Sequence, residues 1–112
     1  MAYDLPDRFA LAARSDAAFN VLEADLMAEK ASSLGHHGRL VEQAMAALRA
    51  FDPASGDAEV RARLVRQAAR HVWAYFVQRE ACGMRDHRHV IKDYGIPGEV
   101  LARLGAAETL QK

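Results

Sequence analysis

The sequence HVWAYFVQREACGMRDHRHVIKDYGIPGEVLARLG, residues 71–105, carries the strongest local structural signals in the chain. A helical apolar pattern ends near Gly83, and glycine is the residue most often found just beyond a helix C-terminus. Asp86 can cap a short helix that Gly95 ends. Pro97 suits the start of a second short helix. These residues predict the end of a long helix followed by a short helical hairpin.

Upstream of this stretch, apolar residues repeat at helical spacing from Asp57 onward. Asp57 is a suitable N-cap, and residues 52–56 (DPASG) form the clearest loop signal in the chain. The predicted apolar face contains Val60, Leu64, Ala68, Val72, Tyr75 and Phe76. We expect this helix to pack through that face, with Trp73, Tyr75 and Phe76 in the core.

The first helical region is predicted to start with Ser15 as its N-cap. Its apolar face is set by Phe19, Leu22 and Leu26, weakens, and resumes with Val41, Ala44, Met45, Leu48 and Phe51. Between the two parts lies Gly35-His36-His37-Gly38, which we interpret as a solvated turn. Two glycines cost about 2 kcal/mol inside a helix, so this pattern predicts a break or a kink there.

No segment alternates apolar and polar residues as a half-buried strand does. The predicted fold is therefore all-α: a small helical bundle of two long helical regions and a short C-terminal helical hairpin. We expect a loose lead-in over residues 1–14, a single helical domain over 15–105 and a tail over 106–112.

The composition predicts that one chain forms only a small hydrophobic core and that a partner subunit completes it. The chain has 112 residues, of which 51% are hydrophobic, but 23 are alanines, which favour helices and bury little area. Thin cores of this kind are often completed by self-association, so we expect a homodimer. Residues 1–56 carry a net charge of −3 and residues 57–112 one of +3, which suits antiparallel self-association.

Charge, cysteine content and hydropathy limit the expected cellular location of the protein and the kinds of partner that it is expected to bind. The formal net charge is zero, whereas nucleic-acid binding favours a strongly basic face. A single cysteine excludes an intramolecular disulfide. The N-terminus lacks the features of a signal peptide, and no apolar run is long enough to span a membrane. We expect a cytoplasmic protein with no membrane partner, and the balanced charge disfavours a nucleic-acid partner without excluding one.

Two groups of residues are candidate metal ligands. Cys82, His87 and His89 form a Cys-x₄-His-x-His pattern, which matches no zinc module. Adjacent residues such as His36 and His37 point about 100° apart on a helix and rarely bind one ion. We interpret Cys82 as a small buried thiol and His87 and His89 as surface imidazoles, and we expect no metal and no cofactor.

The sequence shows no catalytic constellation. No Glu-x-x-His pair, phosphate-binding loop or nucleophile elbow is present. Arg79 or Arg85 could activate the Cys82 thiol, but the helix end at Gly83 would disfavour a thiolate. We therefore assign no catalytic or cofactor-binding residue and favour a protein that is not an enzyme, with a metal-dependent or thiol activity around Cys82, His87 and His89 as a further alternative.

One alternative function is DNA binding. Residues 86–104 have the outline of a helix-turn-helix, with Glu99–Leu104 as the second helix. That helix offers only Arg103 as a base, beside the acidic Glu99, while DNA docking favours positive charge. Arg61, Arg63, Arg66 and Arg70 form a basic run that we interpret as a solvated face. The hairpin is predicted to cap the bundle, with a DNA-binding regulator as the alternative.

The phrases LEADLMAEKASSLG (22–35) and VWAYFVQREACGMRDHRHVIKDYGIPGEVLARLG (72–105) resemble a family of short bacterial proteins known only as a domain of unknown function. The likeness covers residues from about 21 to 105. It implies a self-standing cytoplasmic bacterial domain, and no activity, ligand or catalytic residue.

The leading hypothesis is a self-associating structural or interaction module. Packing explains most of the aromatic and glycine residues after position 71, but it leaves the polar run 78–87 unexplained. We predict a functional surface there, formed by Arg79, Glu80, Arg85, Asp86, His87 and Tyr94.

Overall fold

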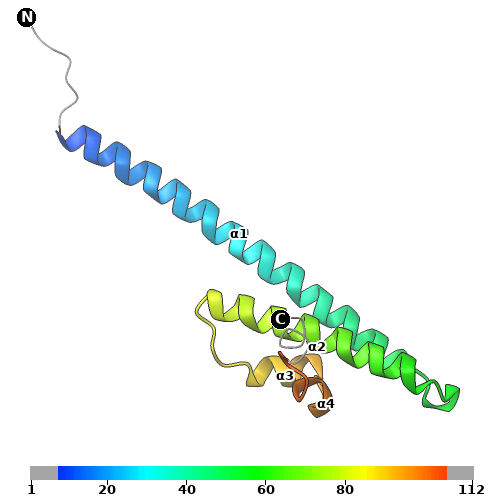
Figure 1. Cartoon of the computed structure of the whole chain (residues 1–112). Helices are drawn as coiled ribbons and strands as arrows, with labels where there is room; N and C mark the ends of the chain where they lie inside the picture. The colour runs from blue at the N-terminus through cyan, green and yellow to red at the C-terminus, as the bar shows by residue number, and fades with distance from the viewer. Residues whose placement is uncertain (1–7, 106–112) are drawn as a thin grey trace, which may run out of the picture. The chain divides into compact units, whose positions relative to one another are not determined.

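The computed structural model describes residues 8–105, and it contains no strand within that range (Figure 1). The elements are α1 (Arg8–Ala50), the 3₁₀ turn η1 (Pro53–Ser55), α2 (Ala58–Ala81), α3 (Arg88–Tyr94) and α4 (Gly98–Leu101). The predicted all-α class, with two long helices and short C-terminal helices, is confirmed. The chain divides into two units, one ending at Ser32 and one beginning at Ser33, and each is described by itself.

In the second unit, the part of α1 from Ser33 onward and α2 run antiparallel, joined by a short loop (Figure 1). Local hydrogen bonds hold the loop. The Asp52 carboxylate accepts from the Ala54 amide at 2.9 Å, and Gly56 takes the left-handed conformation at φ 69°. The Asp57 carboxylate accepts from the Val60 amide at 3.1 Å, which confirms Asp57 as the N-cap of α2.

All four helices contribute to the core of this unit. Its buried apolar side chains are Val41 and Met45 of α1, Val65, Ala68, Ala69, Val72 and Tyr75 of α2, Val90 of α3, Ile96, and Val100 of α4. Most of the predicted faces from position 41 onward lie in this core or pack against it, but Phe51, Val60 and Leu64 are only half-buried and lie outside it. Trp73 is 37% exposed, so its predicted place in the core is wrong. It lies about 100° around α2 from the buried Val72.

Both predicted helix ends after position 71 are confirmed, and both use the same hydrogen-bond pattern. At the end of α2, Met84 N–H donates to the Arg79 carbonyl and Gly83 N–H to the Glu80 carbonyl, both at 2.9 Å. This pair of bonds is the Schellman motif, and Gly83 supplies the left-handed residue it needs at φ 87°. The end of α3 repeats the pattern around Gly95.

The two short helices begin within one residue of their predicted starts, but the N-cap residue of α3 is His87 and not the predicted Asp86. The Asp86 carboxylate accepts from the Arg88 amide at 3.0 Å, at the first residue of α3. Pro97 is the N-cap residue of α4. However, α4 ends at Leu101, so the predicted helix Glu99–Leu104 is only one turn long.

The predicted break at Gly35–Gly38 is wrong, because α1 is helical throughout these residues. Gly38 is buried, and a Cβ there would lie 3.1 Å from Tyr94 Oη and 3.5 Å from Tyr75 Cε1. Glycine at this position lets the α1 backbone approach two tyrosine rings closely. That packing offsets the cost of glycine in a helix, so the pattern marks a contact and not a turn.

The first unit holds the N-terminal part of α1, which starts at Arg8 and not at Ser15. Ser15 therefore lies inside the helix, and its predicted role as N-cap is wrong. The predicted core face of this part is also exposed: Phe19 by 63%, Leu22 by 68% and Leu26 by 51%. Between positions 10 and 32, Leu11, Val21 and Met27 are further large apolar side chains that are exposed.

The predicted domain limits (1–14, 15–105 and 106–112) stay predictions, and residues 1–7 and 106–112 lie outside the described part of the chain. Within residues 8–105, none of the helices combines the length and hydropathy needed to cross a membrane.

Candidate functional site

The polar run after position 78 is organised around Arg79, the one charged side chain that is buried in the described part of the chain, at 5% exposure. Its Nε donates to His87 Nδ1 at 3.1 Å, and its Nη2 donates to the Asp86 carbonyl at 3.0 Å. A buried cation is costly unless its donors find acceptors. Arg79 therefore ties the loop after α2 back onto that helix.

His87 continues this network. A guanidinium can only donate, so His87 Nδ1 must be the acceptor and the ring proton lies on Nε2. His87 Nε2 in turn faces Glu80 Oε1 at 3.3 Å. The imidazole also stacks on the Phe76 ring, with centroids 4.1 Å apart and planes 2° apart. The prediction that His87 is a surface imidazole is wrong, because its side chain is only 13% exposed.

A pair of tyrosines extends the cluster towards α1 and α3. The Tyr75 and Tyr94 rings meet edge to face, with centroids 5.8 Å apart. The Arg79 guanidinium carbon lies 5.9 Å from the Tyr75 ring centroid, at the outer limit of a cation–π contact. Burial, and then a hydrogen bond with Tyr75, raise the pKa of Tyr94 above its ordinary value. Tyr94 is therefore a neutral phenol at physiological pH.

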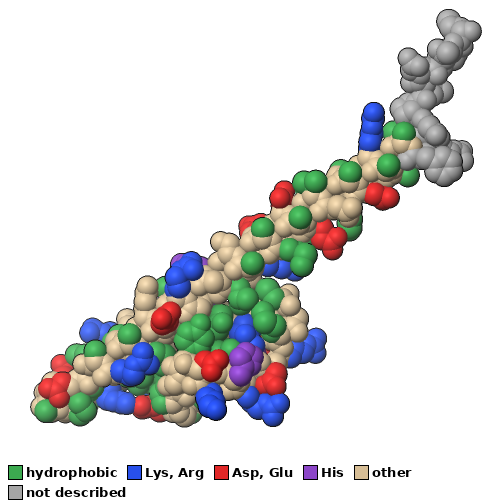
Figure 2. Space-filling model, turned by 180° about the vertical axis from the view of Figure 1, so that it is seen from behind, with side chains coloured by type: hydrophobic (Ala, Val, Ile, Leu, Met, Phe, Trp, Pro, Cys, Tyr) green, Lys and Arg blue, Asp and Glu red, His purple; other side chains and the backbone are tan. Residues whose placement is uncertain are grey.

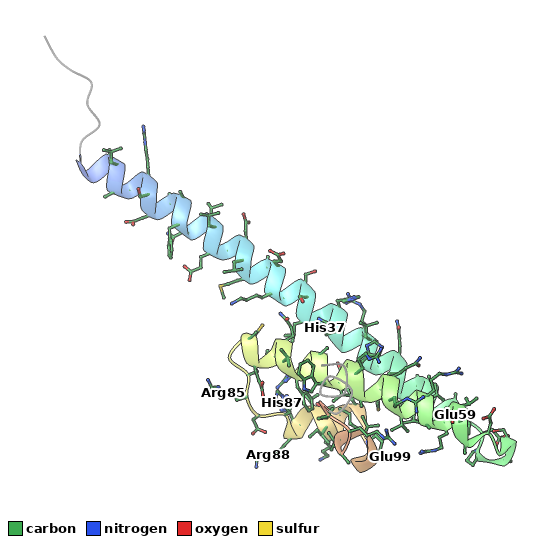
Figure 3. All side chains as sticks on the ribbon, viewed as in Figure 1. His37, Glu59, Arg85, His87, Arg88 and Glu99 are labelled. Carbon is green, nitrogen blue, oxygen red and sulfur yellow. The ribbon has the colours of Figure 1, made fainter. Side chains whose placement is uncertain are left out.

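The structure brings together four of the six residues of the predicted surface: Arg79, Glu80, Asp86 through its carbonyl, and His87. Tyr94 joins them through Tyr75. Arg85 lies on the connecting loop and is exposed (Figure 3). The sequence interpretation missed Tyr75 and Phe76 as members of this cluster. Their spacing of three and four residues before Arg79 is the signal that would have placed them beside it.

The Asp86 carboxylate has a separate role. It accepts from Arg88 Nη2 at 2.8 Å and from Arg88 Nε at 3.0 Å. These hydrogen bonds hold the pKa of Asp86 well below its usual range. The carboxylate is thus a stable anion that holds the backbone and the guanidinium of Arg88, the first residue of α3.

The candidate metal ligands do not form a site. Cys82 is half-buried and its thiol is free, and His89 is exposed. Across the described residues, no three His, Cys, Asp or Glu side chains are placed to hold an ion together. His36 and His37 have ring centroids 5.6 Å apart on consecutive positions of α1.

The hairpin of residues 86–104 is bound to the bundle through α4. The Arg61 guanidinium holds the Glu99 carboxylate with two hydrogen bonds, one from Nη1 at 2.8 Å and one from Nη2. This pairing lowers the pKa of Glu99. Val100 is fully buried. A recognition helix must present several side chains to a DNA groove, and nothing in this single turn supports the DNA-binding alternative.

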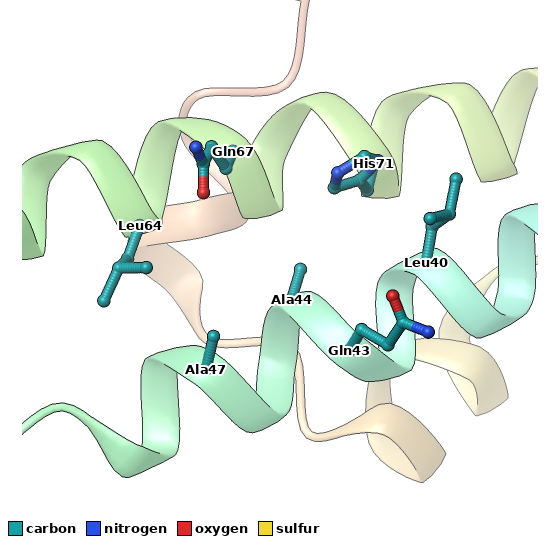
Figure 4. Close-up of a pocket in the computed structure, with 7 residues that line it drawn as sticks. All are labelled: Leu40, Gln43, Ala44, Ala47, Leu64, Gln67 and His71. Carbon is teal, nitrogen blue, oxygen red and sulfur yellow. The ribbon is translucent and has the colours of Figure 1, made fainter.

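A shallow groove of about 190 Å³ lies between α1 and α2 (Figure 4). Its lining is Leu40, Gln43, Ala44 and Ala47 of α1 and Leu64, Gln67 and His71 of α2. Burial, with smaller effects of Arg70 and His37, lowers the pKa of His71. The groove is smaller than the roughly 300–1,000 Å³ typical of small-molecule sites, and it contains no cluster of charged groups.

A second candidate surface is on the first unit. At about 100° per residue, seven side chains between positions 11 and 26 fall on one face of α1, about 120° wide. We call this face the apolar stripe; it comprises Leu11, Ala12, Ser15, Ala18, Phe19, Leu22 and Leu26. No charged residue lies on it between its ends. Hydrophobic side chains are visible on the surface of this part of α1 in Figure 2.

The fold and these surfaces define a small all-helical protein with a short C-terminal hairpin and an uncharged apolar stripe on its first helix. The chain belongs to a family of unknown function (DUF6665), whose profile matches residues 4–112. This membership confirms the resemblance seen in the sequence, and it extends over nearly the whole chain. No curated protein and no solved structure matches the chain.

Proposed function

We propose that this protein is a self-associating interaction module, and that two copies pair through the apolar stripe. The observation that carries this proposal is the exposure of large apolar side chains on one face of α1: Leu11 by 48%, Phe19 by 63%, Leu22 by 68% and Leu26 by 51%. Contiguous apolar surface of this kind is characteristic of interaction sites. A second copy supplies the same uncharged face.

The size of the exposed apolar surface suits a dimer of moderate affinity. Each large apolar side chain contributes roughly 1.5–3 kcal/mol when fully buried. Four of them per copy offset an association cost that is on the order of 4–15 kcal/mol. We therefore expect a dimer in equilibrium with the monomer, with a dissociation constant in the micromolar range.

The hydrogen-bonded cluster of Arg79, Glu80, Asp86 and His87 favours an interaction module over an enzyme. Both ring nitrogens of His87 are hydrogen-bonded, and the Arg79 donors point to the loop that they hold. The cluster thus stabilises the end of the bundle. The free thiol of Cys82 suits a reducing compartment, which supports a cytoplasmic location.

Sedimentation equilibrium tests the proposal with a matched pair of variants. Leu22→Glu introduces a charge into the stripe, whereas Val21→Glu introduces the same charge at the neighbouring position, about 120° from the centre of the stripe. Both native side chains are exposed, by 68% and 60%. We expect wild type and Val21→Glu to sediment at twice the mass of the 12.3 kDa chain. Leu22→Glu should dimerise about 100-fold more weakly.

Circular dichroism provides the control, because all three proteins should retain the same helical signal. A wild-type chain that is monomeric at 100 μM would refute the proposal. Equal weakening by the two substitutions would refute the stripe as the interface.

A further inference from the structure

We infer that the face between α1 and the C-terminal hairpin binds a free α-amino acid with an aliphatic side chain of about the size of leucine. This inference is independent of the proposed self-association, because every residue that it uses lies in the second unit, outside the apolar stripe. It follows from the charges that line two adjoining hollows on this face.

The first hollow has a volume of about 340 Å³, and it is lined by Glu42, Met45 and Arg49 of α1 and by Asp93 and Tyr94 of α3. The three residues of α1 are spaced three and four positions apart, so they share one face of that helix. Met45 is buried and gives the hollow an apolar base. The volume falls in the range of roughly 300–1,000 Å³ that is typical of small-molecule sites.

The charged groups of this hollow are of both signs and are unpaired. Within residues 8–105, neither the Glu42 and Asp93 carboxylates nor the Arg49 guanidinium makes an ion pair. Opposite charges that border one hollow without meeting each other leave room for a molecule that pairs with both. The ammonium group of an amino acid suits the two carboxylates. Its carboxylate suits the guanidinium, which binds such groups with two parallel hydrogen bonds.

Tyr94 forms an uncharged wall of the same hollow. Its ring meets Tyr75 edge to face, and glycine at position 38 leaves the space beside its Oη. Burial and a hydrogen bond with Tyr75 raise the pKa of Tyr94, and the negative charge of Glu42 adds a smaller rise. Tyr94 therefore stays neutral beside Glu42 and leaves that carboxylate available to an ammonium group.

A second hollow, of about 230 Å³, adjoins the first, because Arg49 lines both. Leu48 and Pro97 supply apolar surface to it, and its other two charged residues, Arg61 and Glu99, pair with each other. A ligand whose carboxylate pairs with Arg49 can therefore place an aliphatic side chain against apolar and neutralised surface. A free amino acid carries all three groups on one carbon, whereas the end of a peptide lacks one of the two charges.

Titration of the isotope-labelled full chain with L-leucine, followed by amide chemical shifts, tests this site. Two further probes each remove one charge: L-leucinamide lacks the carboxylate, and N-acetyl-L-leucine lacks the ammonium group. We expect saturable shifts concentrated at residues 42–49 and 93–97. Each probe should bind about fivefold more weakly than leucine, which is the upper end for one exposed ion pair.

Substitutions assign the two charges. Arg49→Gln should remove the preference for leucine over leucinamide, and Asp93→Asn should reduce the preference for leucine over N-acetyl-leucine. Arg39→Gln is the matched control on the same helix, since Arg39 is exposed and lines neither hollow, and it should leave all three affinities unchanged.

The replaced side chains are exposed, so circular dichroism should give the same helical signal for all the variants. Shifts that do not saturate, or that lie outside the two hollows, would overturn the inference. Equal binding of leucine and leucinamide by the wild-type chain would do the same. Sedimentation equilibrium without ligand tests the proposed self-association separately, so either idea can fail alone.

Discussion

At the scale of single residues, Arg79 accounts for the polar run that packing of the aromatic residues left unexplained. Its side chain is buried, and it reaches His87 and the Asp86 carbonyl in the loop of six residues that follows α2. His87 in turn contacts the Glu80 carboxylate through Nε2, and its imidazole stacks on the Phe76 ring. One arginine therefore sets the path of the chain between α2 and α3.

Replacing Arg79 with methionine should lower the free energy of unfolding by about 1–3 kcal/mol. The change keeps an unbranched apolar stem, but it leaves the acceptors on His87 and Asp86 without their buried donor. Urea denaturation measures the loss. Arg85→Met at the exposed loop position is the matched control and should change stability by less than about 0.5 kcal/mol. Equal effects of the two substitutions would contradict this account of Arg79.

His71 predicts how stability depends on pH. Burial, with Arg70 and His37 nearby, lowers its pKa in the folded state below the ordinary 6.5. The unfolded chain then binds the proton more readily than the folded chain does. The contribution of His71 to the free energy of unfolding is therefore fully present above about pH 6.5, and it is lost as the pH falls below that value. The urea midpoint should decrease from pH 7.5 to 5.5, and His71→Gln should reduce that decrease. If the variant keeps the same pH dependence of the urea midpoint, groups other than His71 are its cause.

At the scale of elements, α1 shows how one residue pattern can be misread. Two glycines within four positions predict an interruption, yet α1 continues through them. The difference lies in what surrounds each glycine. Gly38 faces Tyr75 and Tyr94, whereas the nearest atom to a Cβ at Gly35 is the flexible end of Arg39, at 3.4 Å.

The two glycines should respond oppositely to alanine. Gly35→Ala should raise the free energy of unfolding by about 0.5–1 kcal/mol, because alanine is the better helix former. Gly38→Ala should lower it by about 1 kcal/mol, because the added Cβ lies 3.1 Å from Tyr94 Oη and the rings must shift. Thermal or urea unfolding of both variants gives the signs. Stabilisation by Gly38→Ala would show that the tyrosine pair relaxes freely.

At the scale of the whole molecule, the two units use their apolar residues differently. Among residues 33–105, ten apolar side chains are buried, and every helix supplies at least one of them. In residues 10–32, the large apolar side chains are exposed. Phe19, Leu22 and Leu26 have the same helical spacing as Val41, Met45 and Leu48. The first set is nevertheless exposed, whereas the second packs in the core. The proposed dimer would bury the stripe against its own copy.

The sequence alone determined the helical class, the loop at residues 52–56, the cap at Asp57, and the helix ends at Gly83 and Gly95. These features depend on contacts within a few residues, so their signals are local. Only the tertiary structure decided that Gly38 is a contact point, that Trp73 is exposed and Val65 buried, and that Arg79 and His87 meet across a loop. Periodicity reveals that a helix has an apolar face, but what that face meets depends on residues distant in the chain.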